Sequence, residues 1–145
     1  MNNKPIIIIA GEPYSIFFEI YFKIFKSNFI NNYNRPIILI GSKLLMTKQM
    51  KKLNYNYKIN LLNPKKIDSL KISNKQINLI NVNFNFKKTF DKITNKSRNY
   101  IEKCFVIALK LMKDKVGYAL INGPINKKTF LNKKFFGITE YLAFK

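Results

Sequence analysis

Residues 92–124 read KITNKSRNYIEKCFVIALKLMKDKVGYALINGP, and this stretch decides the fold. From Lys92 to Asp114, apolar and small side chains recur at steps of three and four, which is the spacing of one face of a helix. The positions on this face are Ile93, Ser97, Tyr100, Ile101, Cys104, Phe105, Ala108, Leu109 and Met112. The short apolar run from Gly117 to Ile121 then ends at Asn122-Gly123-Pro124, as a buried strand ends in a turn. The stretch therefore predicts a long helix followed by a buried strand.

The same alternation extends toward the N-terminus. The predicted strands are Pro5 to Ala10, Ile37 to Ile40, the weaker Tyr57 to Leu62, and Ile77 to Val82. The predicted helices are Ile16 to about Ser27 and Lys43 to Leu53. Strands that alternate with helices indicate a parallel α/β sheet with right-handed crossovers. We find no repeat and no linker, so we expect one α/β region over residues 1–145.

The charge of the chain has two interpretations. Lys and Arg number 27 against 7 Asp and Glu, which gives a formal net charge of +20. A charge of this size suggests a small basic α/β domain that binds nucleic acid. However, all the basic residues except Arg35 and Arg98 are lysines, and they are spread along the whole chain. Nucleic-acid readers rely on arginine, and Asn, Ile and Phe share AT-rich codons with lysine, so we favour genome composition and do not expect a nucleic-acid partner.

Several chemistries are excluded by what the chain lacks. It has no histidine, so it cannot form a Ser-His triad or a His-ligated zinc site. Its single cysteine, Cys104, cannot form an internal disulfide and lies on the apolar stripe of the long helix, where we expect a small buried hydrophobe. No apolar run reaches the ~20 residues of a membrane span, and none resembles a secretory leader. We therefore expect a cytoplasmic protein with no membrane partner.

Ligands of parallel α/β sheets bind at the carboxyl ends of the strands, which directs attention to two loops. In Gly11 to Ser15, backbone N–H groups and the Ser15 hydroxyl could bind a phosphate at the start of the next helix. The alternative is a plain strand-to-helix turn, with Glu12 placed near a helix N-terminus by the helix dipole. The loop is not a P-loop, because no Gly-Lys-Ser/Thr follows it.

The second loop runs from Asn122 to Lys127 and also follows a predicted strand. Lys127 could pair with a ligand phosphate or carboxylate, or could be a solvated lysine at a helix start. Further on, Thr139 directly precedes a helix-forming segment. We expect its hydroxyl either to cap that helix or to contact an anionic ligand at the positive helix end.

Three motifs occur in a fixed order along the chain. They comprise Gly11-Glu12-Pro13 with Ile16 and Glu19-Ile20, then Gly123-Pro124-Ile125-Asn126-Lys127, then Gly137 with Thr139-Glu140-Tyr141-Leu142-Ala143. In order and spacing they resemble the GEPAGIGPE, TGPINK and GHTE[YF]LA motifs of the 4-hydroxythreonine-4-phosphate dehydrogenase (PdxA) family of vitamin B6 biosynthesis. The resemblance extends over essentially the whole chain, which would correspond to slightly less than half of a family member.

The resemblance implies an isopropylmalate-dehydrogenase-like fold, a three-layer α/β/α arrangement with a mostly parallel sheet, here truncated. It also implies a homodimer that oxidises and decarboxylates a small phosphorylated amino acid, 4-phosphooxy-L-threonine, with NAD. A divalent metal (Zn, Mg or Co) would act as the Lewis acid. Carried over by position, Thr139 is expected to contact substrate, and Lys127 and Glu12 to lie at the edge of the substrate site.

Departures from the family pattern lead to further expectations. Ile138 stands where the family has a substrate-binding histidine, Asn122 replaces a threonine, and Ser15 and Phe17 replace glycines that allow close backbone approach. The metal-binding histidines of the family lie beyond the third motif, so we expect no metal ligand, no catalytic residue and no activity in this chain alone. The alternative within the family is a diverged paralogue that acts on another substrate.

Overall fold

The computed structural model describes residues 4–68, 71–131 and 134–145. Five strands form one sheet in the order β3-β4-β2-β1-β5, and every neighbouring pair is parallel. They are β1 (Ile6–Ile9), β2 (Ile37–Gly41), β3 (Ile59–Leu61), β4 (Ile77–Asn81) and β5 (Ala119–Asn122). In the central register Ile8 lies between Leu39 of β2 and Ile121 of β5. The predicted parallel α/β sheet is confirmed, and in the described residues it is parallel throughout.

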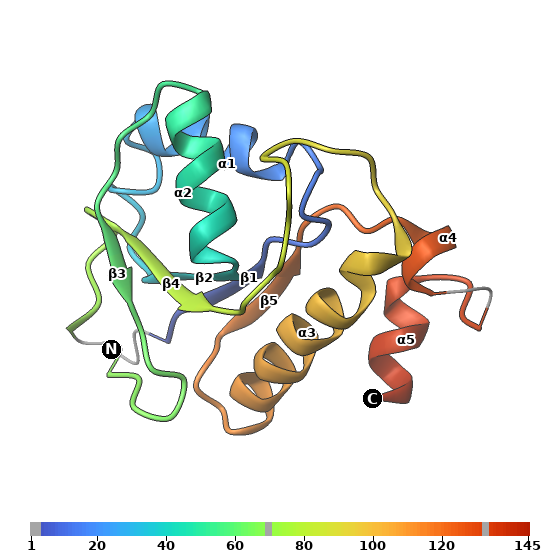
Figure 1. The fold of residues 1–145 in the computed structure, drawn as a ribbon. Helices are drawn as coiled ribbons and strands as arrows, with labels where there is room; N and C mark the ends of the chain where they lie inside the picture. Colours follow the sequence, from blue (N-terminus) through green and yellow to red (C-terminus); the bar gives the residue numbers. More distant parts are fainter. Residues whose placement is uncertain (1–3, 69–70, 132–133) are drawn as a thin grey trace.

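Helices cover both faces of the sheet (Figure 1). Helices α1 (Phe17–Lys26) and α2 (Lys43–Lys52) lie on one face, and α3 (Arg98–Lys113) lies on the other. The short helices α4 (Lys127–Phe130) and α5 (Ile138–Phe144) lie beside α3. The three-layer α/β/α arrangement is therefore confirmed. Within the described ranges, no helix combines the length and apolar character needed to span a bilayer.

Apolar stripes hold α1 and α3 against the two faces of the sheet. The inner face of α1 is almost entirely aromatic, with Phe18, Tyr21, Phe22 and Phe25 all buried. The inner face of α3 includes Cys104, which is fully buried. Burial raises the pKa of the Cys104 thiol to about 12, so the thiol stays protonated and packs as a small hydrophobe, as the sequence predicts.

The predicted helix from Lys92 to Asp114 is wrong at its beginning. Helix α3 starts only at Arg98, and it is preceded by a 3-10 turn, η2 (Asn95–Ser97). The Thr94 hydroxyl accepts a hydrogen bond from the Lys96 N–H and caps this turn, so the chain before it remains extended. Ile93 consequently lies outside the buried stripe and is 37% exposed.

The edge strands are also shorter or shifted relative to the prediction. The strand expected from Tyr57 to Leu62 is only β3, which pairs on one side with β4. The strand expected from Gly117 to Ile121 begins two residues later, as β5, and within the described ranges it pairs with β1 alone. Apolar runs extend beyond the residues that find a partner strand, so pairing and not composition sets these limits.

Candidate functional site

The two loops singled out from the sequence meet at the carboxyl ends of β1 and β5. The Glu12 N–H donates a hydrogen bond to the Pro124 carbonyl at 2.8 Å, and the Gly123 N–H donates to the Ile9 carbonyl at 2.7 Å. Gly11 has φ +77°, and a Cβ there would lie 2.5 Å from the Pro124 oxygen. The glycine therefore permits both the left-handed backbone and the close approach of the two loops.

Phe17 closes the junction between these loops. A Cβ on Gly123 would lie 2.3 Å from the Ala10 oxygen and 2.9 Å from the Phe17 ring, so this ring packs directly on the glycine. Phe17 also stacks on Tyr21, with ring centroids 5.9 Å apart. The Ser15 hydroxyl accepts from the Phe17 N–H at 3.3 Å, so it serves the first residue of α1. This favours the interpretation of the loop as a strand-to-helix turn.

Glu12 has the most unusual environment among the residues predicted to form the site. It is only 2% exposed, and neither carboxylate oxygen has a hydrogen-bond partner among the described residues. Burial raises the pKa of Glu12, and the nearby Ser97 hydroxyl offsets part of this rise. That hydroxyl also donates to the Thr94 carbonyl at 3.0 Å, and burial remains the larger influence on the pKa of Glu12.

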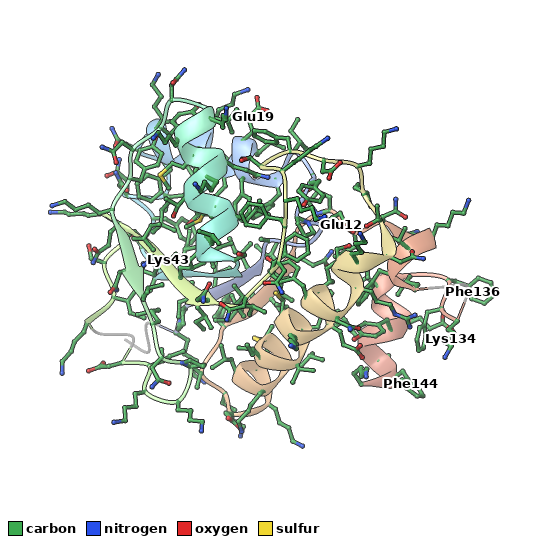
Figure 2. The ribbon with its side chains drawn as sticks, viewed as in Figure 1. Glu12, Glu19, Lys43, Lys134, Phe136 and Phe144 are labelled. Carbon is green, nitrogen blue, oxygen red and sulfur yellow. The ribbon has the colours of Figure 1, made fainter. Side chains whose placement is uncertain are left out.

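The carboxylate of Glu12 lies near the beginning of α3. Figure 2 shows it within the arch formed by the connection from β4 to α3. Ser97, whose hydroxyl acts on this carboxylate, is the N-cap residue of α3. The carboxylate therefore lies close to the N-terminal end of α3 as well as preceding α1 in the chain.

Gln49 is a positioning residue that the sequence analysis missed. It is 1% exposed, and its side-chain amide donates to the Pro13 carbonyl at 3.1 Å and to the Thr89 carbonyl at 3.0 Å. One side chain of α2 thereby holds both the β1–α1 loop and the β4–α3 connection. The only signal in the sequence is a polar residue among the apolar positions of a predicted helix, which does not reveal its partners.

Tyr100 makes a second buried link at this end of the sheet. Its hydroxyl accepts a hydrogen bond from the Ser42 N–H at 3.0 Å, and it joins α3 to the end of β2. Burial raises the pKa of Tyr100 well above its usual value, so the phenol stays neutral. The Ser42 hydroxyl caps α2 by accepting from the Leu45 N–H. The carboxyl edge is therefore braced by α2 and α3 from both faces.

A cavity of about 300 Å³ opens between the β1–α1 loop and the β4–α3 connection. We call it the lysine-lined cavity, and its lining residues are Tyr14, Phe84, Asn85, Phe86, Lys87, Asp91, Lys92, Thr94, Lys96 and Ser97. All except Tyr14 come from the β4–α3 connection. No sequence motif marks this segment, because the cavity is formed by the packing of a long connection against a loop about 70 residues away.

The structure corrects the capping prediction for Thr139. Helix α5 begins at Ile138 with Gly137 as its N-cap, so Thr139 is the second helical residue and its side chain makes no capping bond. The carboxylate of Glu140 instead accepts a hydrogen bond from the Phe136 N–H at 2.6 Å and so holds the residues just before the helix. Ile138 is half-buried against the core, in keeping with its apolar side chain.

Lys127 is the first residue of α4 and is exposed. The N-cap of α4 is Asn126, whose side chain accepts from the Thr129 N–H at 3.1 Å. Among the described residues, the side chains of Lys127 and Thr139 form no hydrogen bond with the loop that carries Glu12. The structure thus joins the first two motif loops through backbone contacts, and it places Thr139 on a separate element beside α3.

The divalent metal implied by the resemblance does not fit the residues described. No group of three His, Cys, Asp or Glu side chains in the described ranges could hold a metal ion. The chain has no histidine at all, and the buried Glu12 belongs to no such group among the described residues. We therefore derive no step through a metal on this chain.

Together, the sheet and its braced carboxyl edge define a three-layer α/β/α protein of the parallel-sheet class, with its candidate site at the strand ends. The family model described as pyridoxal phosphate biosynthetic protein PdxA matches residues 32–145. The chain belongs to the PdxA family. No curated protein gives a significant match.

Solved structures agree with this assignment in their fold. A 4-hydroxythreonine-4-phosphate dehydrogenase from Burkholderia phymatum is 18% identical with a TM-score of 0.78, and the match covers 97% of this chain and 43% of that one. A putative one from Salmonella typhimurium is 18% identical with a TM-score of 0.79, over 97% and 44% of the two chains. The enzyme from Klebsiella pneumoniae is 21% identical with a TM-score of 0.73, over 97% and 44%. The chain spans less than half the length of these structures.

Proposed function

We propose that this chain is the N-terminal portion of an NAD-dependent 4-hydroxythreonine-4-phosphate dehydrogenase. The complete enzyme would be a cytoplasmic homodimer that oxidises and decarboxylates 4-phosphooxy-L-threonine on the route to pyridoxal phosphate. NAD would accept the hydride and a divalent metal would polarise the substrate oxygen. Both groups would rely on residues outside the part of the fold described, so the chain alone is expected to be inactive.

The observation that carries this proposal is the contact between the first two motif loops. The family match begins at residue 32, so Gly11-Glu12-Pro13 lies outside it. The hydrogen bond from the Glu12 N–H to the Pro124 carbonyl joins this loop to the Gly123-Pro124 motif inside the match. Two motifs that are distant in sequence thus lie together at the carboxyl ends of β1 and β5, where substrates of parallel α/β proteins bind.

A chimera tests the proposal. Residues 1–145 would replace the equivalent portion of the Klebsiella pneumoniae enzyme, and NADH formation from 4-phosphooxy-L-threonine would be followed with a divalent metal present. We expect turnover that depends on both NAD and metal. A chimera that is folded by circular dichroism and dimeric by sedimentation, yet forms no NADH, would contradict the proposal.

Ile138 favours a second candidate, a paralogue with another substrate. An apolar, half-buried side chain stands where the family has histidine, so it offers no hydrogen bond to a substrate. The Ile138→Glu and Ile138→His chimeras separate the two candidates, since both add a polar group and only histidine restores the family residue. NADH formation that appears only in the Ile138→His chimera would assign this chain to another substrate within the same family.

A further inference from the structure

The lysine-lined cavity lies where the topology of the sheet favours a ligand. Strand β2 leads into α2 on one face, and its neighbour β4 leads into α3 on the other face. Where adjacent parallel strands send their connections to opposite faces, a crevice forms at the carboxyl ends, and this is the usual ligand position in open α/β sheets. The cavity opens beside this crevice, between Tyr14 and the β4–α3 connection.

The charge of the cavity is positive. Lys87, Lys92 and Lys96 line it, and Asp91 is the single acidic residue among the lining residues. None of these three lysines takes part in an ion pair with a carboxylate in the part of the chain that the structure describes. Asp91 instead accepts a hydrogen bond from the backbone N–H of Lys92 at 2.8 Å. Three ammonium groups are therefore available for an anionic ligand.

The opposite wall of the cavity is aromatic and well packed. Phe84 is 8% exposed and contacts Tyr14 edge-on at 5.9 Å and Tyr100 at 5.0 Å, measured between ring centroids. Phe86 stacks on Phe84 at 6.3 Å. Rings held in this way offer a planar ligand a rigid surface at small entropic cost. The cavity thus combines a site for a phosphoryl group with a site for a planar ring.

The inner end of the cavity lies next to an unsatisfied acceptor. Ser97 lines the cavity and also lies against the buried carboxylate of Glu12, which has no hydrogen bond of its own among the described residues. Native proteins leave few buried polar groups unpaired, and an unpaired one calls for a partner that is missing. A ligand hydroxyl or N–H that reaches past Ser97 would supply that partner.

We propose that the lysine-lined cavity binds a mononucleotide-sized phosphomonoester, with its phosphoryl group on Lys87, Lys92 and Lys96 and its planar ring against Phe84 and Phe86. The volume of about 300 Å³ is at the lower end of ligand sites and suits one ring and one phosphoryl group. Binding of a phosphomonoester in this cavity, which lies next to the loop that carries Glu12, needs neither metal nor turnover.

Calorimetric titration of the full 145-residue chain with AMP tests the proposal. At about 0.15 M salt, which screens non-specific attraction, we expect saturable binding of one AMP. Adenosine lacks the phosphoryl group and ribose 5-phosphate lacks the planar adenine base, so both should bind more weakly than AMP. NAD distinguishes a dinucleotide site from a mononucleotide site, and we expect it to bind no more tightly than AMP.

Matched lysine variants distinguish AMP binding in the cavity from attraction of AMP to the overall charge of the chain. The triple variant Lys87→Gln, Lys92→Gln, Lys96→Gln and the control Lys48→Gln, Lys51→Gln, Lys52→Gln remove the same charge, and the control lysines are exposed on α2. We expect at least a tenfold weaker AMP affinity for the cavity variant and less than a twofold change for the control, on the order expected for lost charged contacts.

Three outcomes would overturn the proposal. They are the absence of saturable AMP binding, an equal loss of affinity in both triple variants, and binding of NAD without binding of AMP. If the triple variant fails to fold, the single variants Lys92→Gln and Lys51→Gln replace it, with the same expected order of affinities. Because binding is measured without turnover, failure here leaves the proposed dehydrogenase activity unaffected, and the reverse also holds.

Discussion

Glu12 is the residue whose environment has the clearest consequence for stability. Burial raises its pKa above the ordinary value of 4.5. Between the unfolded and the folded pKa, the folded protein keeps a proton that the unfolded chain has released. The free energy of unfolding therefore falls as the pH rises from about 4.5 through the raised folded pKa, and above that value the full cost of the buried charge is present.

Replacement of this carboxyl by an amide should remove that pH dependence. We expect Glu12→Gln to raise the free energy of unfolding by about 1–3 kcal/mol at neutral pH, because it removes a buried charge that has no donor. The two proteins should become equally stable below about pH 4, where the glutamic acid is neutral in both states. Urea unfolding followed by circular dichroism across this pH range measures the difference.

Glu19→Gln is the matched control for this substitution. Glu19 is a half-exposed residue paired with Lys23 at 2.7 Å, so its replacement should change stability by less than about 1 kcal/mol at any pH. A Glu12→Gln protein that is less stable than the unmodified chain at neutral pH would show that the carboxylate has a stabilising partner.

At the scale of elements, α2 holds the site together through Gln49. Its two hydrogen bonds, to the carbonyls of Pro13 and Thr89, join two segments that also meet through the rings of Tyr14 and Phe84. Both carbonyls would lose this partner in a Gln49→Met variant, which keeps the length of the side chain. We expect the free energy of unfolding to fall by about 1–3 kcal/mol per group left unsatisfied.

Hydrogen exchange distinguishes a local effect of Gln49→Met from general destabilisation. Backbone amides in residues 84–97 should exchange faster in this variant, while those of β1 and β2 change only with global stability. Gln76→Met is the control, because Gln76 precedes β4, is half-exposed and makes no side-chain hydrogen bond among the described residues. Uniform acceleration across the sheet would contradict a positioning role for Gln49.

At the scale of the whole molecule, β5 forms one edge of the sheet, and no further strand pairs with it in the part of the chain that the structure describes. Strand β5 pairs only with β1, and Ile121 on this edge is 49% exposed. Parallel sheets are normally covered on both faces, and exposed apolar edges promote association. Phe136, just before α5, and Phe144, the last residue of α5, add further apolar surface at 94% and 73% exposure.

We expect the isolated chain to self-associate through this edge and Ile121→Lys to reduce the associated fraction at least twofold, because an edge lysine opposes strand pairing. Sedimentation velocity measures that fraction at fixed protein concentration. Ile93→Lys adds the same charge at a residue that is 37% exposed and lies outside the sheet. An equal reduction in both variants would attribute the change to net charge and not to the edge.

Much of the fold could be predicted from local pattern. The runs that became β1 and β2 are apolar and end at glycine or proline, so their limits are encoded nearby. The apolar repeat of α3 likewise identified Tyr100 and Cys104 as inner residues. The start of α3 was missed because a cap at Thr94 overrides the apolar spacing, and the cap of α5 was placed at Thr139 because the sequence does not distinguish adjacent capping positions.

The candidate site likewise has some features that are encoded locally in the sequence and others that depend on tertiary packing. By itself, the sequence determined the parallel α/β class, the family resemblance and the two motif loops, because strand ends and turn residues are local features. Only the tertiary structure decided that Glu12 is buried without a partner, that Gln49 braces two loops, and that three lysines and two phenylalanines enclose one cavity. These properties depend on which distant segments pack together, and packing is set by the whole sheet.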